Sequence, residues 1–275
     1  MRIDSHQHFW HYEPIKHAWI DDEMHRIRRD YTPKDLAPLL AASGMAGCVA
    51  VQADQTTAET DFLLTIAAEN DFIKGVVGWI DLRAEDLEEQ LDHYAGQPKL
   101  KGWRHVVQGE PDPFFLLRDD FLRGIETIGK HGYTYDILIF PHQLVSALEL
   151  IDSFPNVRFV IDHLAKPYLK AGYYKGWAAM MEAIAPYENA YCKVSGLVTE
   201  GDYHSWTAAQ LQRYFDVLFG AFPADRLMFG SDWPVAEVAV AYGRWVGVVE
   251  DYLATNPDTD AAKVMGGTAT EFYGL

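Results

Sequence analysis

Two histidines separated by one residue are the first side chains in the sequence whose types and spacing could do chemistry. His6 and His8 end the run RIDSHQH, which is typical of a short strand. Because alternate side chains of a strand point to the same side, the two imidazoles should converge. Neutral imidazoles arranged in this way are good ligands for zinc or a similar ion. A hydrogen-bonded histidine pair near the surface is the alternative, so the motif needs support from elsewhere in the chain.

Two further polar groups follow apolar runs late in the chain. His163 ends the run FVIDH, and Asp232 follows the run RLMFGS. Each also has a structural interpretation, His163 as a hydrogen-bonded core histidine and Asp232 as a residue that caps the turn before Pro234. If the chain closes into a barrel, its last strand lies beside its first, and Asp232 then lies near His6 and His8. Three polar clusters at one rim would form an active site.

Eight short strand-like runs alternate with helical segments along the chain. Most of them are apolar and rich in β-branched residues, as expected of parallel strands buried on both faces. The alternation predicts an α/β fold, a single (β/α)8 barrel over residues 1–275, with its active site at the C-terminal ends of the strands. An open doubly wound sheet is the alternative, but no glycine-rich phosphate loop follows the first run. The runs begin near Arg2, Gly47, Ile73, Leu100, Tyr133, Val157, Tyr191 and Arg226.

The connection after the first strand is unusually long and covers residues 9–31. Thr32 can cap the helix that follows, Pro33 fits its first turn, and Asp35 favours its positive end. A long connection on the top face of a barrel is typical of a lid or binding loop, with irregular packing as the alternative. We expect a lid.

The composition limits the class of partner. The chain of 275 residues carries 23 basic and 40 acidic residues, a net charge of −17, and 49% of its residues are hydrophobic. This acidic excess repels phosphate backbones and anionic membranes, so neither partner is expected; the alternative interpretation is that the excess only keeps the protein soluble. Cys48 and Cys192 are interpreted as core residues of a reducing compartment, and we expect a cytoplasmic protein. The composition is compatible with either a monomer or a homo-oligomer.

Taken in order, the motifs resemble those of the amidohydrolase superfamily. HQH after the first strand, DHLAKP at the sixth and GSDWP at the eighth carry the resemblance. With PHQL after the fifth strand and KVSGLVTE at the seventh, the chain resembles more narrowly the lactonase branch, whose members act on L-fuconolactone, L-rhamnonolactone or 2-pyrone-4,6-dicarboxylate. The resemblance runs from about Arg2 to Tyr273. HQH alone is the least specific of these motifs, whereas the ordered set is strongly specific.

The resemblance implies a distorted (β/α)8 barrel, hydrolysis of a cyclic ester, and four central residues. Asp232 would be the catalytic base that takes a proton from water and returns it to the leaving alkoxide. His163 would bind the carbonyl oxygen or position the water. His6, His8 and Asp232 would hold one divalent metal ion, with zinc as the first candidate, or the two histidines would donate hydrogen bonds in a metal-independent reaction.

The fourth strand departs from the pattern of the two-metal members of the superfamily. Those proteins carry a carboxylated lysine there, whereas this chain reads GWRHVV, and Lys99 and Lys101 come too early in the strand. We therefore do not expect a binuclear centre. A zinc-dependent decarboxylase of the same superfamily is the first alternative activity, and a non-catalytic sugar-binding barrel is the alternative from a different class.

The substrate-binding candidates lie near the ends of strands. Aromatic faces suit the C–H faces of a sugar ring, and polar groups suit its hydroxyls. The tryptophans could instead pack at the rim, and His142 could begin a helix or serve as a metal ligand. A pyrone dicarboxylate would need several arginines, and only Arg104 offers one clearly, with Arg83 as a second candidate, so we expect a neutral aldonolactone. The candidates are Gln52, Trp103, Arg104, His105, His142 and Trp233.

Overall fold

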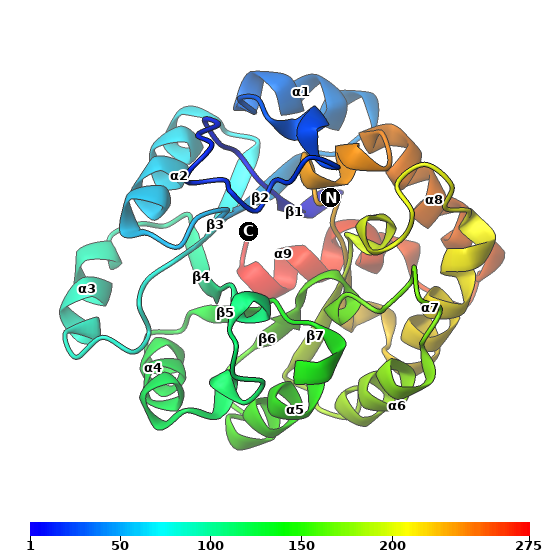
Figure 1. Ribbon diagram of the computed structural model, residues 1–275. Helices are drawn as coiled ribbons and strands as arrows, with labels where there is room; N and C mark the ends of the chain where they lie inside the picture. Colours follow the sequence, from blue (N-terminus) through cyan, green and yellow to red (C-terminus); the bar gives the residue numbers. More distant parts are fainter.

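The computed structural model describes residues 1–275 as eight parallel strands around a common axis, surrounded by helices (Figure 1). The strands follow one another around the sheet in the order of the sequence. This confirms the predicted (β/α)8 barrel. The strands are β1 (Ile3–Gln7), β2 (Gly47–Val51), β3 (Ile73–Gly78), β4 (Leu100–His105), β5 (Thr134–Ile137), β6 (Phe159–Ile161), β7 (Ala190–Val194) and β8 (Leu227–Phe229). The helices are α1 (Pro33–Ala42), α2 (Thr57–Glu69), α3 (Leu87–Tyr94), α4 (Asp119–Lys130), α5 (Leu144–Ser153), α6 (Lys175–Ile184), α7 (Ala208–Ala221), α8 (Tyr242–Thr255) and α9 (Thr268–Tyr273).

Local sequence accounts for these elements. Each predicted strand-like run contains one strand, and the strands are buried almost throughout, as parallel strands between a core and a layer of helices must be. Helix α1 begins at Pro33, as predicted. The carboxylate of Asp35 accepts hydrogen bonds from the backbone N–H and the hydroxyl of Thr32, at 2.9 and 2.7 Å, which fixes the first turn.

Helix α9 closes one end of the barrel interior. In Figure 1 this helix (red) crosses the centre of the barrel. Its residues Ala269, Phe272 and Tyr273 join a buried apolar cluster with Ile3 of β1 and Val160 of β6, among others. Because apolar side chains fill this end, a ligand can enter the barrel only from the other end, where the strands have their C-termini.

The seam between β8 and β1 brings two distant segments together. An isolated bridge joins Gln7 of β1 to Trp233, which follows β8, and the backbone N–H of Asp232 donates to the carbonyl of His6 at 2.8 Å. The buried carboxylate of Asp4 reinforces the seam, because it accepts from the N–H of Ser231 at 2.8 Å and from the hydroxyl of Tyr242 at 3.0 Å. Burial raises the pKa of Asp4 to about 6. The seam therefore holds the segment after β8 directly against the end of β1.

Residues 9–31 form the long connection between β1 and α1. Backbone hydrogen bonds of 3.0 and 2.9 Å between Trp10 and Tyr31 close the segment on itself, and Trp10 is buried. Trp19 is 42% exposed, and together with Met24 it lines the cavity described below. The segment thus has the position expected of a lid, and its movement stays a prediction.

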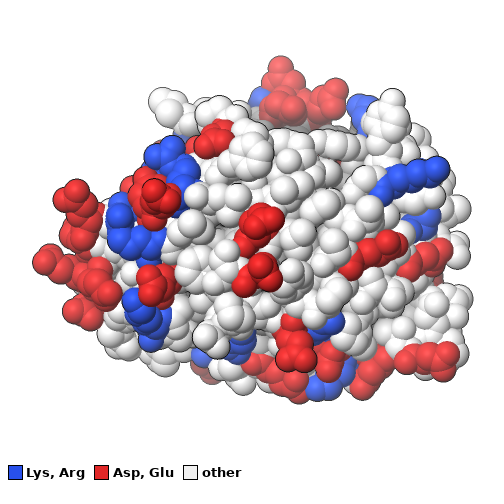
Figure 2. Space-filling model, turned by 90° about the horizontal axis from the view of Figure 1, so that it is seen from below, with Lys and Arg blue, Asp and Glu red and all other residues white.

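The surface reflects the acidic composition. On the face shown in Figure 2, acidic side chains predominate and basic ones lie among them, in keeping with 40 acidic against 23 basic residues in the sequence. None of the helices has both the length and the apolar character needed to cross a membrane.

Candidate active site

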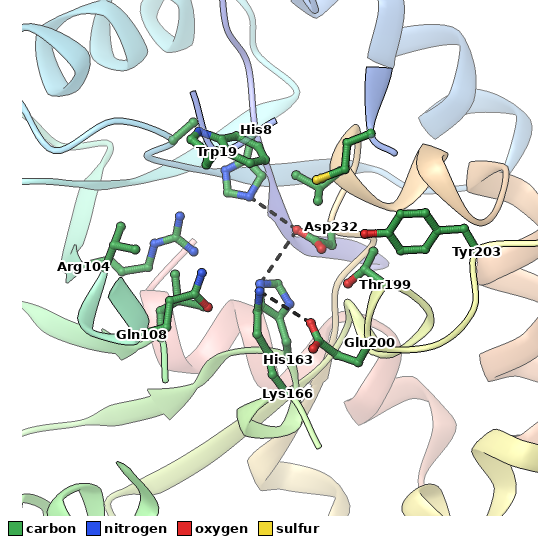
Figure 3. A pocket seen from close by; sticks show the side chains of 15 residues that line it. His8, Trp19, Arg104, Gln108, His163, Lys166, Thr199, Glu200, Tyr203 and Asp232 are labelled. Carbon is green, nitrogen blue, oxygen red and sulfur yellow. Dashed lines mark ion pairs between the residues drawn. The ribbon is translucent and has the colours of Figure 1, made fainter. Parts of the chain in front are cut away.

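A cavity of about 310 Å³ opens at the C-terminal ends of the strands. This volume falls within the usual range for small-molecule sites. Figure 3 shows that the side chains of His8 and His163 point toward Asp232, with Arg104 on one side of the cavity and Glu200 on another. His8, His163 and Asp232 are therefore three of the residues that we predicted from the sequence to lie at the centre of the site.

The carboxylate of Asp232 lies between two imidazoles. Its Oδ1 atom is 3.4 Å from Nε2 of His8 and 3.8 Å from Nε2 of His163. His6 lies close to both, with its Nε2 atom 3.2 Å from Nε2 of His8 and 3.9 Å from Oδ1 of Asp232. All four side chains are buried. The structure thus brings together four residues from β1, β6 and β8 or the turns that follow them, as the sequence predicted.

The charge state of the site suits proton transfer. Burial alone would raise the pKa of the Asp232 carboxyl, but the imidazoles of His163, His8 and His6 hold that pKa below its usual range. Burial lowers the pKa of His163 to about 4, so this imidazole is neutral at pH 7. An ionised carboxylate beside a neutral imidazole can accept a proton from water.

A strained turn directly after β6 presents His163. Four successive residues, from His163 to Lys166, have φ between 50 and 55°, and none of them is glycine. This left-handed conformation costs about 1–2 kcal/mol per residue. The indole N–H of Trp177 donates to the carbonyl of Leu164 at 2.6 Å, and Nδ1 of His163 lies 2.8 Å from the hydroxyl of Ser195. Strain of this kind concentrates at functional sites, and here it turns His163 and Lys166 toward the cavity.

Gly196, which follows β7, leaves the space that His163 occupies. It has φ +60°, and a Cβ atom there would lie 2.5 Å from Nδ1 of His163 and 3.1 Å from Oδ2 of Asp232. We expect Gly196→Ala to displace both side chains and to lower kcat/KM roughly tenfold or more, because small misplacements of reacting groups are costly. Gly44→Ala is the matched control, since Gly44 has φ +65° and open space around it. Both variants should lose stability in thermal melts, and equal activity in the two would contradict the steric argument.

His8 is oriented to offer a nitrogen to a metal ion. Its Nδ1 atom lies 2.8 Å from the carbonyl oxygen of Val51, which can only accept a hydrogen bond, so Nδ1 carries the proton. The lone pair of Nε2 then faces His6 and Asp232. Ligand atoms of a tetrahedral zinc site with bonds of about 2.0–2.1 Å lie about 3.3 Å apart. The observed separations of 3.2, 3.4 and 3.9 Å fit one such ion.

His6 can adopt either tautomer. Its Nδ1 atom faces Nζ of Lys193 at 3.2 Å and Oδ1 of Asp162 at 3.3 Å. When Nδ1 carries the proton, it can donate to Oδ1 of Asp162, which also lies 3.0 Å from Nζ of Lys193. The lone pair of Nε2, which Nη1 of Arg104 approaches to 3.3 Å, can then bind a metal. When Lys193 donates to Nδ1, Nε2 carries the proton and can donate to His8. The surroundings of His6 therefore satisfy both a metal-bound and a metal-free arrangement.

A network of buried charges lies beneath these histidines. Lys193 on β7 is fully buried, with Nζ 2.5 Å from Asp136 on β5 and 3.0 Å from Asp162. Arg104 on β4 contacts Asp162 at 3.0 Å and donates to the carbonyl of Gln52. Burial raises the pKa of Asp136 to about 6 in spite of Lys193. Burial would also raise the pKa of Asp162, but Lys193, His6 and Arg104 hold it well below its usual range.

Of the six predicted substrate-binding residues, only Arg104 lines the cavity. Trp103 and His105 flank it on β4, and alternate residues of a strand face opposite sides. Trp103 is buried against Tyr94 and Tyr133, outside the barrel. Nε2 of His105 donates to the carboxylate of Glu110 at 2.7 Å, and its Nδ1 atom accepts from the indole N–H of Trp79 at 3.3 Å. This corrects the position expected for Trp103 and His105.

The other three predicted substrate-binding residues also lie away from the cavity. Gln52 is buried, and its side-chain amide donates to the backbone carbonyl of Arg104 at 3.1 Å, so it supports that residue. Trp233 is buried and donates to Glu237 at 3.0 Å. His142 is exposed, and its Nδ1 atom is 3.4 Å from the hydroxyl of Tyr168. The turn after Asp232 directs Trp233 away from the site, which its position in the motif did not reveal.

Several cavity residues were not singled out from the sequence. Trp19 and Met24 come from the long connection, Lys166 and Glu200 from the turns after β6 and β7, and Tyr203 from the segment beyond. Lys166 and Glu200 lie inside the motifs DHLAKP and KVSGLVTE, so the motifs themselves could have identified these two residues as part of the site.

The chain is similar to known proteins over most or all of its length. A family model described as amidohydrolase matches residues 3–275. The chain is similar to an L-fucono-1,5-lactonase of Burkholderia multivorans, with 37% identity over 287 residues that cover 100% of this chain and 96% of the relative. It is also similar to an L-rhamnono-gamma-lactonase of Scheffersomyces stipitis, with 24% identity over 201 residues that cover 64% of this chain and 59% of the relative.

The fold is also similar to that of a solved structure. The crystal structure of an amidohydrolase from Burkholderia multivorans with bound zinc superposes with a TM-score of 0.96 at 37% identity. The match covers 100% of this chain and 99% of that one.

Proposed function

Since the chain belongs to the amidohydrolase family, we propose that it is a lactonase that opens a sugar-derived lactone to the open-chain acid. The observation that carries this proposal is the ionised carboxylate of Asp232, placed between His8 and His163 in a cavity of small-molecule size. The similarity to an L-fucono-1,5-lactonase over the whole chain makes L-fucono-1,5-lactone the first substrate to test.

The charges in the cavity support a neutral substrate. The guanidinium of Arg104 is engaged by Asp162 and by the carbonyl of Gln52. The ammonium group of Lys166 is paired with Glu200 at 3.6 Å. A dicarboxylate would need cations free to bind its two carboxylates, and these two are already compensated. A neutral aldonolactone, such as that of L-fucose or L-rhamnose, therefore fits better than a pyrone dicarboxylate.

In the proposed mechanism Asp232 accepts a proton from the water that attacks the lactone carbonyl. The hydroxyl of Ser195 can donate to Nδ1 of His163, which leaves a proton on Nε2 of His163 for a hydrogen bond to the carbonyl oxygen. As the ester C–O bond breaks, Asp232 returns the proton to the ring oxygen. The product is the open-chain hydroxy acid, and the carboxylate is regenerated.

A metal ion fits this arrangement. His6, His8 and Asp232 would hold one divalent ion, with zinc as our first choice, which would supply Lewis acidity and lower the pKa of bound water. This assignment rests on the donor atoms present and on the tautomer of His8 described above. The zinc in the crystal structure of the similar amidohydrolase makes zinc the ion to test first.

A pH-indicator assay tests the proposed function directly. Ring opening of a neutral lactone releases acid, so a panel of sugar lactones in weak buffer should show acid release above the spontaneous rate, with L-fucono-1,5-lactone among the best substrates. Release of carbon dioxide from an aromatic acid, without acid release from any lactone, would overturn the proposal in favour of a decarboxylase.

Removal of the metal should lower activity. We expect dialysis against a chelator to reduce kcat roughly tenfold or more and added zinc to restore it, because the ion would polarise the reacting carbonyl. Elemental analysis of the same samples gives the zinc content, and His8→Asn should lower that content even in enzyme that has not been dialysed. Unchanged turnover in protein shown to be free of metal would contradict this prediction and favour the metal-independent reaction.

A further inference from the structure

An ion pair in the cavity wall has no part in the mechanism above. Nζ of Lys166 lies 3.6 Å from Oε1 of Glu200, and the two side chains are 18% and 17% exposed. Both line the cavity that contains His163 and Asp232 (Figure 3). Because 3.6 Å is longer than a direct hydrogen bond, each group keeps hydrogen-bonding capacity for a ligand.

The backbone places this pair at a cost. Lys166 has φ 50°, at the end of the left-handed turn that begins at His163. Glu200 ends the short helix Leu197–Glu200, which begins after Gly196 with φ 60°. A lysine gains nothing in stability from this conformation, which favours glycine or asparagine. The same strained segment thus aims one side chain at the reacting centre and a second at the wall beside it.

The pair has the chemistry needed to recognise neighbouring hydroxyl groups. A carboxylate accepts hydrogen bonds from hydroxyls, and an ammonium group donates to their oxygens. Hydrogen bonds to charged groups are stronger than those between neutral groups. The pair is neutral as a unit, so it favours an uncharged polyol over an anion. Trp19, Met24 and Val235 provide apolar surface elsewhere in the cavity, which suits the C–H groups of a sugar ring.

We propose that Lys166 and Glu200 bind hydroxyl groups of the sugar ring and make the enzyme specific for hydroxylated lactones over plain ones. This inference rests on the proposed lactonase function and adds its specificity determinants. It assigns the pair to substrate binding, whereas the attack on the carbonyl belongs to Asp232 and His163.

The test compares two six-membered lactones that differ in their hydroxyl groups. We would measure kcat and KM on L-fucono-1,5-lactone and on δ-valerolactone, which carries no hydroxyls, for the wild type, Glu200→Gln and Lys166→Met. Each substitution should raise KM for the sugar lactone about 10- to 100-fold with kcat nearly unchanged, because a charged hydrogen bond to substrate is lost. The value of kcat/KM on δ-valerolactone should change by less than about threefold. Glu271→Gln, in the exposed Lys263–Glu271 pair, is the matched control and should alter neither substrate.

Each outcome decides between the claims. If kcat falls equally on both lactones, Glu200 acts in the chemistry, for example as an acid for the leaving oxygen, and the specificity proposal is overturned. An unchanged KM for the sugar lactone in both variants overturns it as well. Thermal melts identify a misfolded variant. If Glu200→Gln misfolds, Glu200→Asp and Lys166→Met provide the test of the specificity proposal. If the wild type opens neither lactone, the proposed function itself has failed.

Discussion

Asp232→Asn is expected to lower kcat on the preferred lactone by about 10²- to 10⁴-fold. The amide has nearly the same shape as the carboxylate but cannot take a proton from water. Asp232 lies at the centre of the site, 3.4 Å from His8 and 3.8 Å from His163. Steady-state kinetics with a pH indicator measure the loss.

The fold should survive this substitution. The backbone N–H of Asp232, which bonds to His6 at the seam, is unchanged by it, so circular dichroism and the melting temperature should stay close to those of the wild type. Asp30→Asn, at an exposed carboxylate, controls for the loss of a charge. Turnover of Asp232→Asn within a few fold of the wild type would remove Asp232 from the role of proton acceptor.

Lys193→Met is expected to lower the free energy of unfolding by about 3–5 kcal/mol, because it leaves the buried carboxylates of Asp136 and Asp162 without their shared cation. Urea denaturation at pH 8 measures the loss. The loss should be smaller at pH 5. Without Lys193 the pKa of Asp136 rises beyond its present value of about 6. When the pKa of a carboxyl is raised in the folded state, the protein loses stability as the pH rises through that pKa, because the folded state then has to hold a buried charge.

Two variants separate this effect from a general loss of charge. Lys130→Met, in the exposed Lys130–Glu126 pair, should cost less than about 1 kcal/mol. The double variant Lys193→Met with Asp136→Asn should recover part of the lost stability, because one of the uncompensated charges is gone. A double variant no more stable than the single one would argue against the electrostatic explanation.

The sequence predicted the barrel well because its signal is local. Parallel strands buried on both faces are mostly short apolar runs, and each of the eight runs identified in the sequence contains one strand. The capping residues Thr32 and Asp35 located the first helix for the same reason. The order of the strands followed from their alternation with helices, since consecutive parallel strands lie side by side.

The site was predictable only in part. Residues at strand ends, such as His6 and Asp232, could be placed at one rim from the barrel alone. The direction of a side chain is harder to infer, and alternation along β4 excludes Trp103 and His105 from the cavity once Arg104 is known to face inward. The left-handed turn that ends at Lys166 contains neither glycine nor asparagine, so little in the sequence indicated it.

The buried network was missed because pairing is a property of the folded chain. Lys193 and Asp136 lie in different strands, and the sequence around each residue does not indicate which residue it pairs with. The available signal was a single charge within an apolar strand, which is rarely buried unless it is paired. Two such residues in one sequence indicate an internal ion pair.

The closure of the barrel at the β1–β8 seam also bears on how the protein refolds. The groups that meet there lie more than two hundred positions apart in the chain, and contacts over such separations form slowly. Hydrolysis needs this seam to be closed, because the seam holds the segment that carries Asp232 against His6. Turnover regained after dilution from denaturant therefore reports closure of the seam, whereas far-ultraviolet dichroism reports the helices whether or not the seam has closed.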